Sequence, residues 1–288
     1  MKLITWNIQW GLGMDGRLDL GRIVAEARRI ADFDLLCLQE VADNFPDLPG
    51  SPGMNQFAEF ARLLPGYAPV EGIAVDVPDQ AGGRRRFGNL ILSRRPVGQV
   101  LRHSLWDCDD TQNMPRMAIE AVVEAPFGPV RVVTTHLEYF SEKLRRAGVE
   151  AVRAAHARAC ARAARPPRPG QGPYGPWPSS ASAVLVGDFN MRPDDPAKAR
   201  IEASFPDGAP AFRDAWQVLH PSEPHPPSFC ISDQTYGPPH CCDFAFITED
   251  LAPHLVRIVY ETETRASDHQ PVLIEFRDGP MTRRALPD

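Results

Sequence analysis

Apolar positions along this chain follow two patterns, short continuous runs and longer stretches with helical spacing. Short continuous runs are typical of strands that are buried on both faces. They predict strands at residues 3–8, 34–39, 87–93, 130–135, 183–186, 244–247, 256–260 and 272–276. Residues 116–124 predict a further strand, because the apolar side chains there repeat with period two, at Met117, Ile119, Ala121 and Val123.

Helical spacing predicts three helices, each preceded by a residue that favours the N-cap position. Asp19 precedes the first of them, and Asn55 precedes a short helix that continues to Leu64. Ser141 begins a long Ala- and Arg-rich helix that ends near Arg165. The apolar face of the first helix consists of Leu20, Ile23, Val24, Ala27 and Ile30.

The order of these elements indicates the fold class. Strands and helices alternate in the first part of the chain, and hairpin-like pairs of strands follow. This order predicts an α/β protein with mixed sheets and helices outside them. A core of two sheets flanked by helices accounts for it.

The composition is that of a globular protein with a substantial core. Of the 288 residues, 43% are hydrophobic and 24% are charged, which excludes disorder of the whole chain. No apolar run approaches the ~18–20 residues of a membrane helix. The N-terminal residues also lack the apolar region of a signal peptide. We therefore expect no membrane insertion and a cytoplasmic location.

Proline marks the loops of the chain. The 30 prolines are roughly twice the usual ~5% of residues. Residues 166–182 form a Pro/Gly-rich stretch that we expect to be a surface loop, and residues 221–227 and 237–239 predict further loops. We expect a single domain over residues 1–288, with residues 278–288 as its C-terminal tail.

Cysteine content and net charge narrow the class of protein further. The six cysteines are sparse and irregularly spaced, so no disulfide framework is expected. His240, Cys241 and Cys242 form no complete set of four zinc ligands with a second pair, and zinc is not predicted. The net charge of −6 disfavours non-specific nucleic-acid binding without excluding it.

Polar residues recur where the predicted strands end. Because strand ends meet at one rim of a sheet, these side chains are expected to lie together. Each has a simpler structural alternative when taken singly, such as a turn residue or a solvated carboxylate. Carboxylates and amides of this kind suit Mg²⁺ or Mn²⁺, which polarises a phosphoryl group. The set consists of Asn7, Glu40, His136, Asp188, Asn190, Asp268 and His269.

The strings around these residues resemble one known family. The chain is similar to the endonuclease/exonuclease/phosphatase superfamily, the fold of pancreatic deoxyribonuclease, over residues 2–276. GDFN and SDH are specific in combination, whereas the shorter strings are weak alone. The matching strings are TWNI (5–8), LQEV (38–41), GNLILSRRP (88–96), TTHLEY (134–139), GDFN (187–190), CDFAFI (242–247) and SDHQPV (267–272).

The resemblance implies a four-layer α/β-sandwich, with two mixed β-sheets packed face to face and flanked by helices. It also implies metal-dependent hydrolysis of a phosphate ester by in-line attack of water, without a covalent enzyme intermediate. The implied metal ligands are Asn7, Glu40 and Asp268. The implied catalytic residues are His136, Asp188, Asn190, Asp243 and His269.

The resemblance assigns separate roles to the catalytic residues. Asp188 orients or deprotonates the attacking water, and Asn190 holds the phosphate or the nucleophile. His269 contacts the scissile phosphate with Asp243 as its carboxylate partner, and His136 donates to the phosphate oxygens. A carboxylate partner favours the protonated form of an imidazole, which stabilises charge that develops on the phosphate. Whether Asp188 or His269 is the general base stays open at this point.

Other positions border the expected site or narrow the branch of the family. Asn89 and Arg116 are expected to border the phosphate pocket. Residues 84–86, three consecutive arginines, either reach a polyanionic substrate or form a solvated loop. Gln9 replaces the acidic residue of the abasic-site endonucleases and His136 their tyrosine, which disfavours an abasic-site role.

These observations lead to one main functional hypothesis and two alternatives. The main hypothesis is a Mg²⁺- or Mn²⁺-dependent phosphodiesterase whose phosphate-ester substrate is unassigned. The first alternative is a DNA or RNA nuclease of the same superfamily, which would make nucleic acid the substrate. The second is a non-catalytic binding protein on this fold. No obligate protein partner is implied.

Overall fold

The computed structural model describes residues 1–80, 82–105, 112–166, 169–175 and 177–279. These residues form two six-stranded mixed sheets. In spatial order, the first sheet consists of β11 (Leu255–Tyr260), β12 (Val272–Phe276), β1 (Lys2–Asn7), β2 (Leu35–Asp43), β4 (Arg84–Ser93) and β3 (Ala68–Pro78). The second consists of β5 (Val97–Ser104), β6 (Met117–Ala125), β7 (Gly128–His136), β8 (Ala183–Asp188), β10 (Asp243–Thr248) and β9 (Phe212–Asp214).

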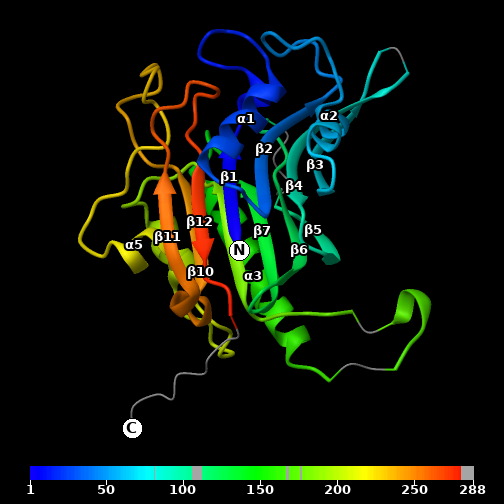
Figure 1. The fold of residues 1–288 in the computed structure, drawn as a ribbon, viewed down its shortest axis with the longest axis vertical. Helices are drawn as coiled ribbons and strands as arrows, with labels where there is room; N and C mark the ends of the chain where they lie inside the picture. The colour runs from blue at the N-terminus through cyan, green and yellow to red at the C-terminus, as the bar shows by residue number, and fades with distance from the viewer. Residues whose placement is uncertain (81, 106–111, 167–168, 176, 280–288) are drawn as a thin grey trace.

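Helices cover the outer face of each sheet, as Figure 1 shows. The first sheet packs against α1 (Leu20–Ile30) and α2 (Gln56–Leu63), and the second against α3 (Glu142–Ala163), α4 (Pro196–Glu202) and α5 (Ala215–Leu219). Short 3₁₀ turns occur at η1 (Gln9–Gly11), η2 (Gly172–Tyr174) and η3 (Glu249–His254). The expected two-sheet α/β-sandwich is confirmed.

The N-caps of the three predicted helices are formed by the expected side chains. Asp19 accepts a hydrogen bond from the backbone N–H of Arg22, and Asn55 accepts one from that of Ala58. Ser141 accepts one from the backbone N–H of Leu144. Each cap pairs an N–H that has no partner within its own helix, which fixes where the helix begins.

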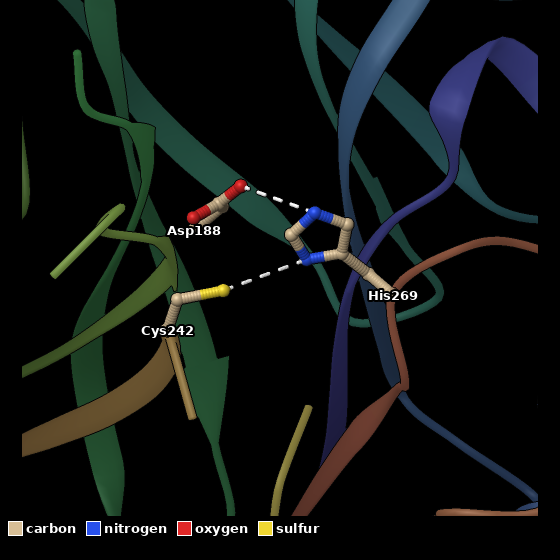
Figure 2. Close-up of side chains that lie close together, drawn as sticks. All are labelled: Asp188, Cys242 and His269. Carbon is tan, nitrogen blue, oxygen red and sulfur yellow. Dashed lines mark hydrogen bonds and ion pairs between the residues drawn. The ribbon is translucent and has the colours of Figure 1, made fainter. Parts of the chain in front are cut away.

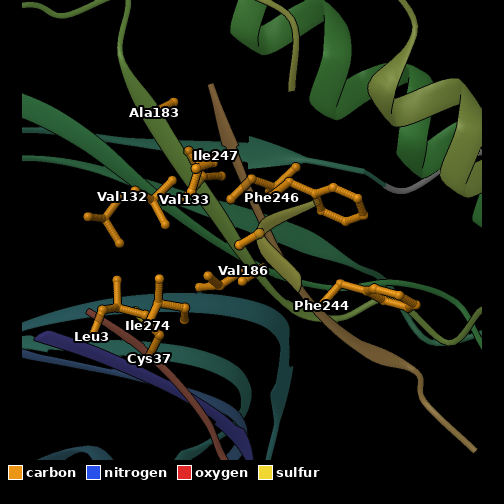
Figure 3. Packing of buried hydrophobic residues seen from close by; sticks show 14 of the residues in the cluster. Leu3, Cys37, Val132, Val133, Ala183, Val186, Phe244, Phe246, Ile247 and Ile274 are labelled. Carbon is orange, nitrogen blue, oxygen red and sulfur yellow. The ribbon is translucent and has the colours of Figure 1, made fainter. Parts of the chain in front are cut away.

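Successive residues of the central strands in the first sheet face opposite sides and so belong to different clusters of the core. Leu3 lies in the cluster between the two sheets, whereas its neighbour Ile4 lies in the cluster under α1 and α2. Figure 3 shows Leu3, Cys37 and Ile274 of the first sheet facing the second sheet at Val132 and Val186. Burial on both faces explains the continuous apolar runs of these strands.

The strands that the sequence analysis did not predict lie mainly at the edges of the sheets. β3 and β5 are edge strands with many exposed or half-exposed residues, so they lack an apolar run. β9 is also an edge strand and contains only three residues. Helices α4 and α5 contain seven and five residues, too few to show a clear helical period.

The described parts of the Pro/Gly-rich stretch at residues 166–182 extend from the lower end of the molecule in Figure 1, where β8 begins. That is the end of the strands opposite to the one where β1 and β8 finish. Nine residues of the expected C-terminal tail, 280–288, lie outside the described residues. Within the described part of the chain, no helix has the length and apolar character needed to cross a membrane.

Two pairs of parallel strands determine where polar side chains gather. β1 runs parallel to β2 in the centre of the first sheet, and β7 runs parallel to β8 in the centre of the second. β10 is antiparallel to β8 and begins with Asp243, which lies opposite Asp188. The last residues of four strands and the first residue of a fifth therefore lie at the same end of the sandwich.

Candidate active site

A cavity of about 380 Å³ opens at this end of the two sheets. Seven of the ten site residues predicted from sequence line it: Glu40, Arg116, His136, Asp188, Asn190, Asp268 and His269. Two more, Asn7 and Asp243, are buried directly behind the lining and bonded to it. The tenth, Asn89, is buried and donates to the carbonyl of Met117 at 3.2 Å, so the structure does not bring it to the cavity.

Strand register positions the residues of the second sheet. His136 and Asp188 are the last residues of β7 and β8 and lie opposite each other. Asp243 pairs with Asp188 from the other side. Three neighbouring strands thus place one imidazole and two carboxylates in adjacent positions.

Strained backbone surrounds the cavity. Glu40 has a φ of 60° at a β-bulge in β2, and Asn190 has a φ of 50°. Gln9 and Trp10 also have positive φ, and all four residues line the cavity. Such conformations cost free energy for residues other than glycine and occur preferentially at functional sites. At Asn190 the turn is stabilised by its backbone N–H, which donates to Oδ1 of Asp188 at 2.9 Å.

The segment between β11 and β12 is fastened to β1. The Ser267 hydroxyl donates to the carbonyl of Asn7 at 2.9 Å and accepts from the backbone N–H of His269 at 3.2 Å. The buried indole of Trp6 donates to the carbonyl of His269 at 2.9 Å. These bonds hold the imidazole of His269 over the end of β1.

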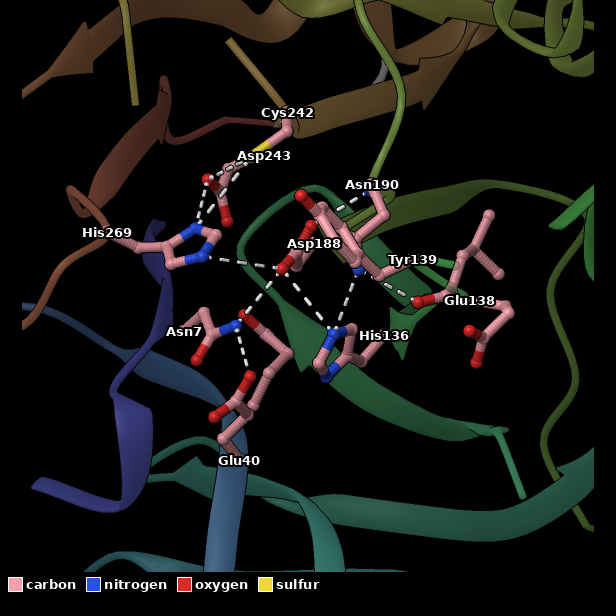
Figure 4. Close-up of polar contacts among 12 residues, drawn as sticks. Asn7, Glu40, His136, Glu138, Tyr139, Asp188, Asn190, Cys242, Asp243 and His269 are labelled. Carbon is pink, nitrogen blue, oxygen red and sulfur yellow. Dashed lines mark hydrogen bonds and ion pairs between the residues drawn. The ribbon is translucent and has the colours of Figure 1, made fainter. Parts of the chain in front are cut away.

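Asp188 is the centre of the polar contacts (Figure 4). The side-chain amide of Asn7 donates to Oδ2 of Asp188 and to Oε1 of Glu40, both at 3.0 Å. Nε2 of His136 lies 3.5 Å and Nε2 of His269 lies 3.7 Å from the same Oδ2. One buried carboxylate oxygen is therefore approached by three side chains from three strands or loops.

A second buried carboxylate determines the charge of His269. Oδ2 of Asp243 lies 2.9 Å from Nδ1 of His269 and accepts from the Ser228 hydroxyl at 2.7 Å. Burial alone lowers the pKa of His269, but the charges of Asp243 and Asp188 outweigh burial and hold the pKa well above its usual value. His269 is a cation at neutral pH.

His136, in contrast to His269, is uncharged at neutral pH. Burial, together with the positive charges of Arg116 and His269, lowers the pKa of His136 well below its usual value. Its ring is neutral at neutral pH, and Nε2 lies 3.1 Å from the side-chain nitrogen of Asn190. The cavity thus contains one cationic and one neutral imidazole.

Burial and the charges of neighbouring carboxylates disfavour the ionised forms of Glu40 and Asp188. Burial and the nearby charge of Asp268 raise the pKa of Glu40 to about 7. Burial also raises the pKa of Asp188 to about 6, although the cationic His269 opposes the rise. A divalent cation beside these oxygens would remove the repulsion. A set of carboxylate oxygens is what a hard cation such as Mg²⁺ or Mn²⁺ prefers, so the residues present fit such an ion.

The side chain of Asn7 is not oriented as expected for a metal ligand. Its side-chain oxygen accepts from the backbone N–H of Gln9 at 3.1 Å, and its nitrogen faces the carboxylates of Glu40 and Asp188. In this arrangement Asn7 positions the two carboxylates and does not present its oxygen to the cavity. Glu40 and Asp268 remain as the oxygen donors of the predicted ligand set.

Asp188, Cys242 and His269 form a cluster of ligand-type atoms within 4.8 Å of one another (Figure 2). Sγ of Cys242 lies 3.8 Å from Nδ1, whereas the Asp188 oxygen faces Nε2. The imidazole therefore lies between the other two groups, and Nδ1 already contacts Asp243. The neighbours of Cys242 do not converge on a zinc site either. The His240 ring faces the backbone carbonyl of Pro238, and Sγ of Cys241 donates to the backbone carbonyl of Asp243.

Arg116 depends on a residue that the sequence analysis quoted within TTHLEY but assigned no role. Nε of Arg116 donates to Oε2 of the buried Glu138 at 3.0 Å. Oε1 of Glu138 accepts from the backbone N–H of Phe140 at 2.8 Å. Nη1 of Arg116 is buried without a hydrogen-bond partner among the described residues, and the Arg116 side chain is part of the cavity lining.

The three consecutive arginines at residues 84–86 are each paired with the protein's own carboxylates. Arg84 pairs with Asp76, and Arg85 pairs with Asp47 and Asp79. Arg86 likewise pairs with Asp43 at 2.5 Å and with Glu71. Their charges are largely compensated within the fold, which disfavours a role in binding a polyanion.

Comparison with solved structures identifies similar folds of known description. An endonuclease/exonuclease/phosphatase from Beutenbergia cavernae DSM 12333 aligns with a TM-score of 0.64 and 23% identity, covering 97% of this chain and 72% of that one. A mannosyl-6-phosphatase from Bacteroides thetaiotaomicron VPI-5482 aligns with a TM-score of 0.64 and 16% identity, covering 96% and 99%. A 3′ phosphatase from Neisseria, bound to a product DNA hairpin, aligns with a TM-score of 0.57 and 21% identity, covering 96% and 99%.

At these identities the likeness concerns the fold. No curated protein matches the sequence. A family model described as the Endonuclease/Exonuclease/phosphatase family matches residues 4–269, a range that contains every residue of the cavity and leaves out β12 and the first two residues of β1. The chain therefore belongs to the endonuclease/exonuclease/phosphatase family.

Proposed function

We propose that this protein is a divalent-metal-dependent hydrolase of phosphate esters that acts on diesters by in-line attack of water. The observation that supports it is the convergence of a neutral His136 and a cationic His269 on Asp188, in a cavity that also contains Glu40 and Asp268. When bound beside Glu40 and Asp268, the metal would polarise the phosphoryl group and neutralise charge on its oxygens.

Asp188 is the residue that receives the proton of the attacking water. Its pKa, raised to about 6, lies near the pH at which a general base is most effective. Asn7 and the backbone N–H of Asn190 fix the orientation of its two oxygens. His269 is less suited to this role, because its pKa is held high and it is already protonated.

His269 and Arg116 are the groups that stabilise the phosphate. Both are cationic and line the cavity, so they oppose the negative charge that develops in the transition state. A diester has one negative charge, whereas a monoester has up to two. With three carboxylates among the lining residues, the balance of charge favours the diester.

The proposal is tested by hydrolysis of bis-p-nitrophenyl phosphate with and without Mn²⁺. We expect turnover that EDTA abolishes and that Asp188→Asn lowers by about 10²–10⁴-fold, the usual contribution of a general base. Asp207→Asn is the matched control, because Asp207 is an exposed carboxylate outside the cavity. Turnover that persists in EDTA, or in Asp188→Asn, would contradict the proposal.

Two further substrates separate the alternatives. Faster hydrolysis of p-nitrophenyl phosphate than of the diester would indicate a monoesterase. Nicking of supercoiled plasmid with strong salt dependence would indicate a nuclease. Absence of metal binding by calorimetry in a well-folded protein would favour the non-catalytic alternative.

A further inference from the structure

Four aromatic side chains line one part of the cavity, and we call them the aromatic wall: Tyr139, Phe140, Phe229 and Tyr236. The first two follow β7 in the segment that leads to α3, and the other two lie between α5 and β10. No step of the hydrolysis proposed above uses them.

The rings of the aromatic wall contact one another in sequence, starting at the phosphate-binding residues. Phe229 stacks on the imidazole of His269 with ring centroids 4.4 Å apart. Tyr236 stacks on Phe229 at 6.1 Å, and Tyr139 meets Tyr236 edge-on at 6.1 Å. Phe140 meets Tyr139 edge-on at 4.9 Å. An unbroken aromatic surface therefore extends from His269 to the mouth of the cavity.

The outer rings of the wall are exposed to an unusual degree. Phe140 is 84% exposed, Tyr236 60% and Tyr139 38%. Single exposed apolar residues are common, but a contiguous group of them at a cavity indicates a binding surface. Because the group adjoins His269, its ligand is a part of the molecule whose phosphate His269 contacts.

Backbone hydrogen bonds hold the segments that carry Tyr139, Phe140 and Phe229. Nη1 of Arg145 donates to the carbonyls of Glu138 and Tyr139, both at 3.1 Å, and the backbone N–H of Phe140 donates to Glu138. The backbone N–H of Phe229 donates to the carbonyl of His240 at 3.0 Å. A surface ordered in advance loses little conformational entropy on binding, which favours a specific ligand.

We propose that the aromatic wall binds a flat, uncharged aromatic ring in the organic part of the phosphate ester. The inference depends on the proposed function and names the substrate class of the same site: compact esters that combine one phosphate with an aryl group or a nucleobase. Flat rings stack favourably on aromatic side chains. The cavity of about 380 Å³ lies at the small end of the range for ligand sites.

Other phosphate esters fit the same surroundings less well. A polynucleotide needs cationic side chains along its backbone, and the three arginines at residues 84–86 are engaged with carboxylates. An ester with a small alkyl or sugar group would leave the exposed rings of Phe140 and Tyr236 without a stacking partner. An aromatic ring beside the phosphate satisfies both observations.

Binding of phosphonates tests the inference without any turnover. We expect phenylphosphonate to bind the Mn²⁺-supplemented protein about tenfold more tightly than methylphosphonate in calorimetry, the effect of one good stacking contact. Phe140→Ala and Tyr236→Ala should each remove most of this difference. Tyr174→Ala is the matched control, because Tyr174 is 87% exposed but lies outside the cavity, and it should leave the difference unchanged.

Position 236 separates a stacking role from a merely structural one. Tyr236→Phe keeps a flat ring and should retain the preference for phenylphosphonate, whereas Tyr236→Leu keeps an apolar side chain and should lose it. Equal loss in both variants, or equal affinity of the two phosphonates in the unchanged protein, would overturn the inference. The melting temperature of each variant shows that it is folded.

Turnover of matched diesters identifies the source of the ring. Methyl, phenyl and thymidine-5′ esters of p-nitrophenyl phosphate share one leaving group, and we expect the methyl ester to have the lowest kcat/KM. A higher value for the phenyl ester indicates an aryl substrate, and a higher value for the thymidine ester indicates a nucleotide. Hydrolysis of these esters, combined with equal affinity of the two phosphonates, would refute the wall alone. If the protein preferred phenylphosphonate but hydrolysed none of the esters, the proposed hydrolase activity would be refuted and the proposed role of the aromatic wall would stand.

Discussion

The imidazole rings of His136 and His269 face the same carboxylate oxygen of Asp188, but His136 is neutral and His269 is cationic. Their Nε2 atoms lie 3.5 Å and 3.7 Å from Oδ2 of Asp188. What separates them is a second carboxylate. Asp243 contacts Nδ1 of His269 and raises its pKa, whereas His136 has no second carboxylate partner among the described residues, and burial together with the positive charges of Arg116 and His269 lowers its pKa. The fold thus obtains a cationic and a neutral imidazole from the same residue type.

The first prediction concerns the pKa of His269. Asp243→Asn removes the charge that raises this pKa, so His269 should lose its proton at a lower pH than in the unchanged protein. Because a protonated His269 is needed for activity, activity is present below that pKa and is lost as the pH rises through it. We therefore expect the alkaline limb of kcat/KM to shift to lower pH, with kcat at neutral pH reduced by about 10²-fold or more.

Ser228→Ala is the matched control for this variant. The Ser228 hydroxyl donates to the same Oδ2 of Asp243, so its removal weakens the orientation of the carboxylate but keeps its charge. We expect a small loss of kcat without a shift of the alkaline limb. If Asp243→Asn and Ser228→Ala had the same pH profile, the charge of Asp243 would not be what determines the state of His269.

The second prediction concerns Glu138, which we interpret as a positioning residue for Arg116. Glu138→Gln keeps the size of the side chain but removes the charge that holds Nε of Arg116 at 3.0 Å. We expect inhibition by inorganic phosphate to weaken by about tenfold, since hydrogen bonds between charged groups contribute about 1.5–3 kcal/mol. KM should rise more than kcat falls.

A surface pair provides the comparison for Glu138. Glu142 is 61% exposed and pairs with Arg146 at 2.6 Å within α3. Such exposed pairs contribute little to stability or binding, so Glu142→Gln should leave phosphate inhibition unchanged. Unchanged inhibition in Glu138→Gln as well would show that Arg116 keeps its position without this carboxylate.

The strand-end pattern predicted much of the site because it follows from the fold itself. His136 and Asp188 end parallel strands with apolar residues on both faces, so sequence alone placed them at one rim. Glu138 had no such signal. Its role depends on Arg116, which the antiparallel pairing of β6 and β7 brings alongside the residues that follow His136.

Irregular segments and edge strands were beyond the reach of sequence patterns. Phe229 and Tyr236 lie in a loop-rich stretch with no period, and only its folding against His269 makes them part of the cavity. The edge strands β3 and β5 face solvent along much of their length and lack the apolar runs of central strands. Asn89 lies among buried apolar residues of β4, and its side-chain amide donates a hydrogen bond to the backbone carbonyl of Met117 in the other sheet.

The third prediction concerns metal binding and stability. Burial and the charge of Asp268 destabilise the ionised form of Glu40, so a bound divalent cation should stabilise the folded protein. We expect Mn²⁺ to raise the melting temperature of the unchanged protein. Glu40→Gln should melt at a higher temperature than the unchanged protein in EDTA and should respond less to Mn²⁺.

Glu249→Gln is the control for Glu40, because Glu249 is a surface carboxylate that pairs with Arg213 at 3.2 Å. It should behave as the unchanged protein with and without Mn²⁺. An undiminished rise of the melting temperature in Glu40→Gln would remove Glu40 from the proposed ligand set.

The fourth prediction concerns acid stability and a histidine far from the cavity. His156 lies on the buried face of α3, where Nδ1 lies 2.7 Å from the guanidinium of Arg131 and Nε2 lies 2.9 Å from the carbonyl of Pro210. Burial, reinforced by the charge of Arg131, lowers the pKa of His156 to about 4. The unfolded chain protonates this histidine near pH 6.5, so it binds more protons than the folded chain between these two values.

Stability should therefore be lost as the pH falls from about 6.5 towards 4, by about 3 kcal/mol for this residue alone. His156→Gln cannot titrate, and although we expect it to be less stable at neutral pH, its unfolding free energy in urea should decline less between pH 7 and pH 4.5. His220→Gln changes a partly exposed histidine and should keep the steep decline. Parallel declines in His156→Gln and the unchanged protein would mean that acid unfolding is governed by other groups.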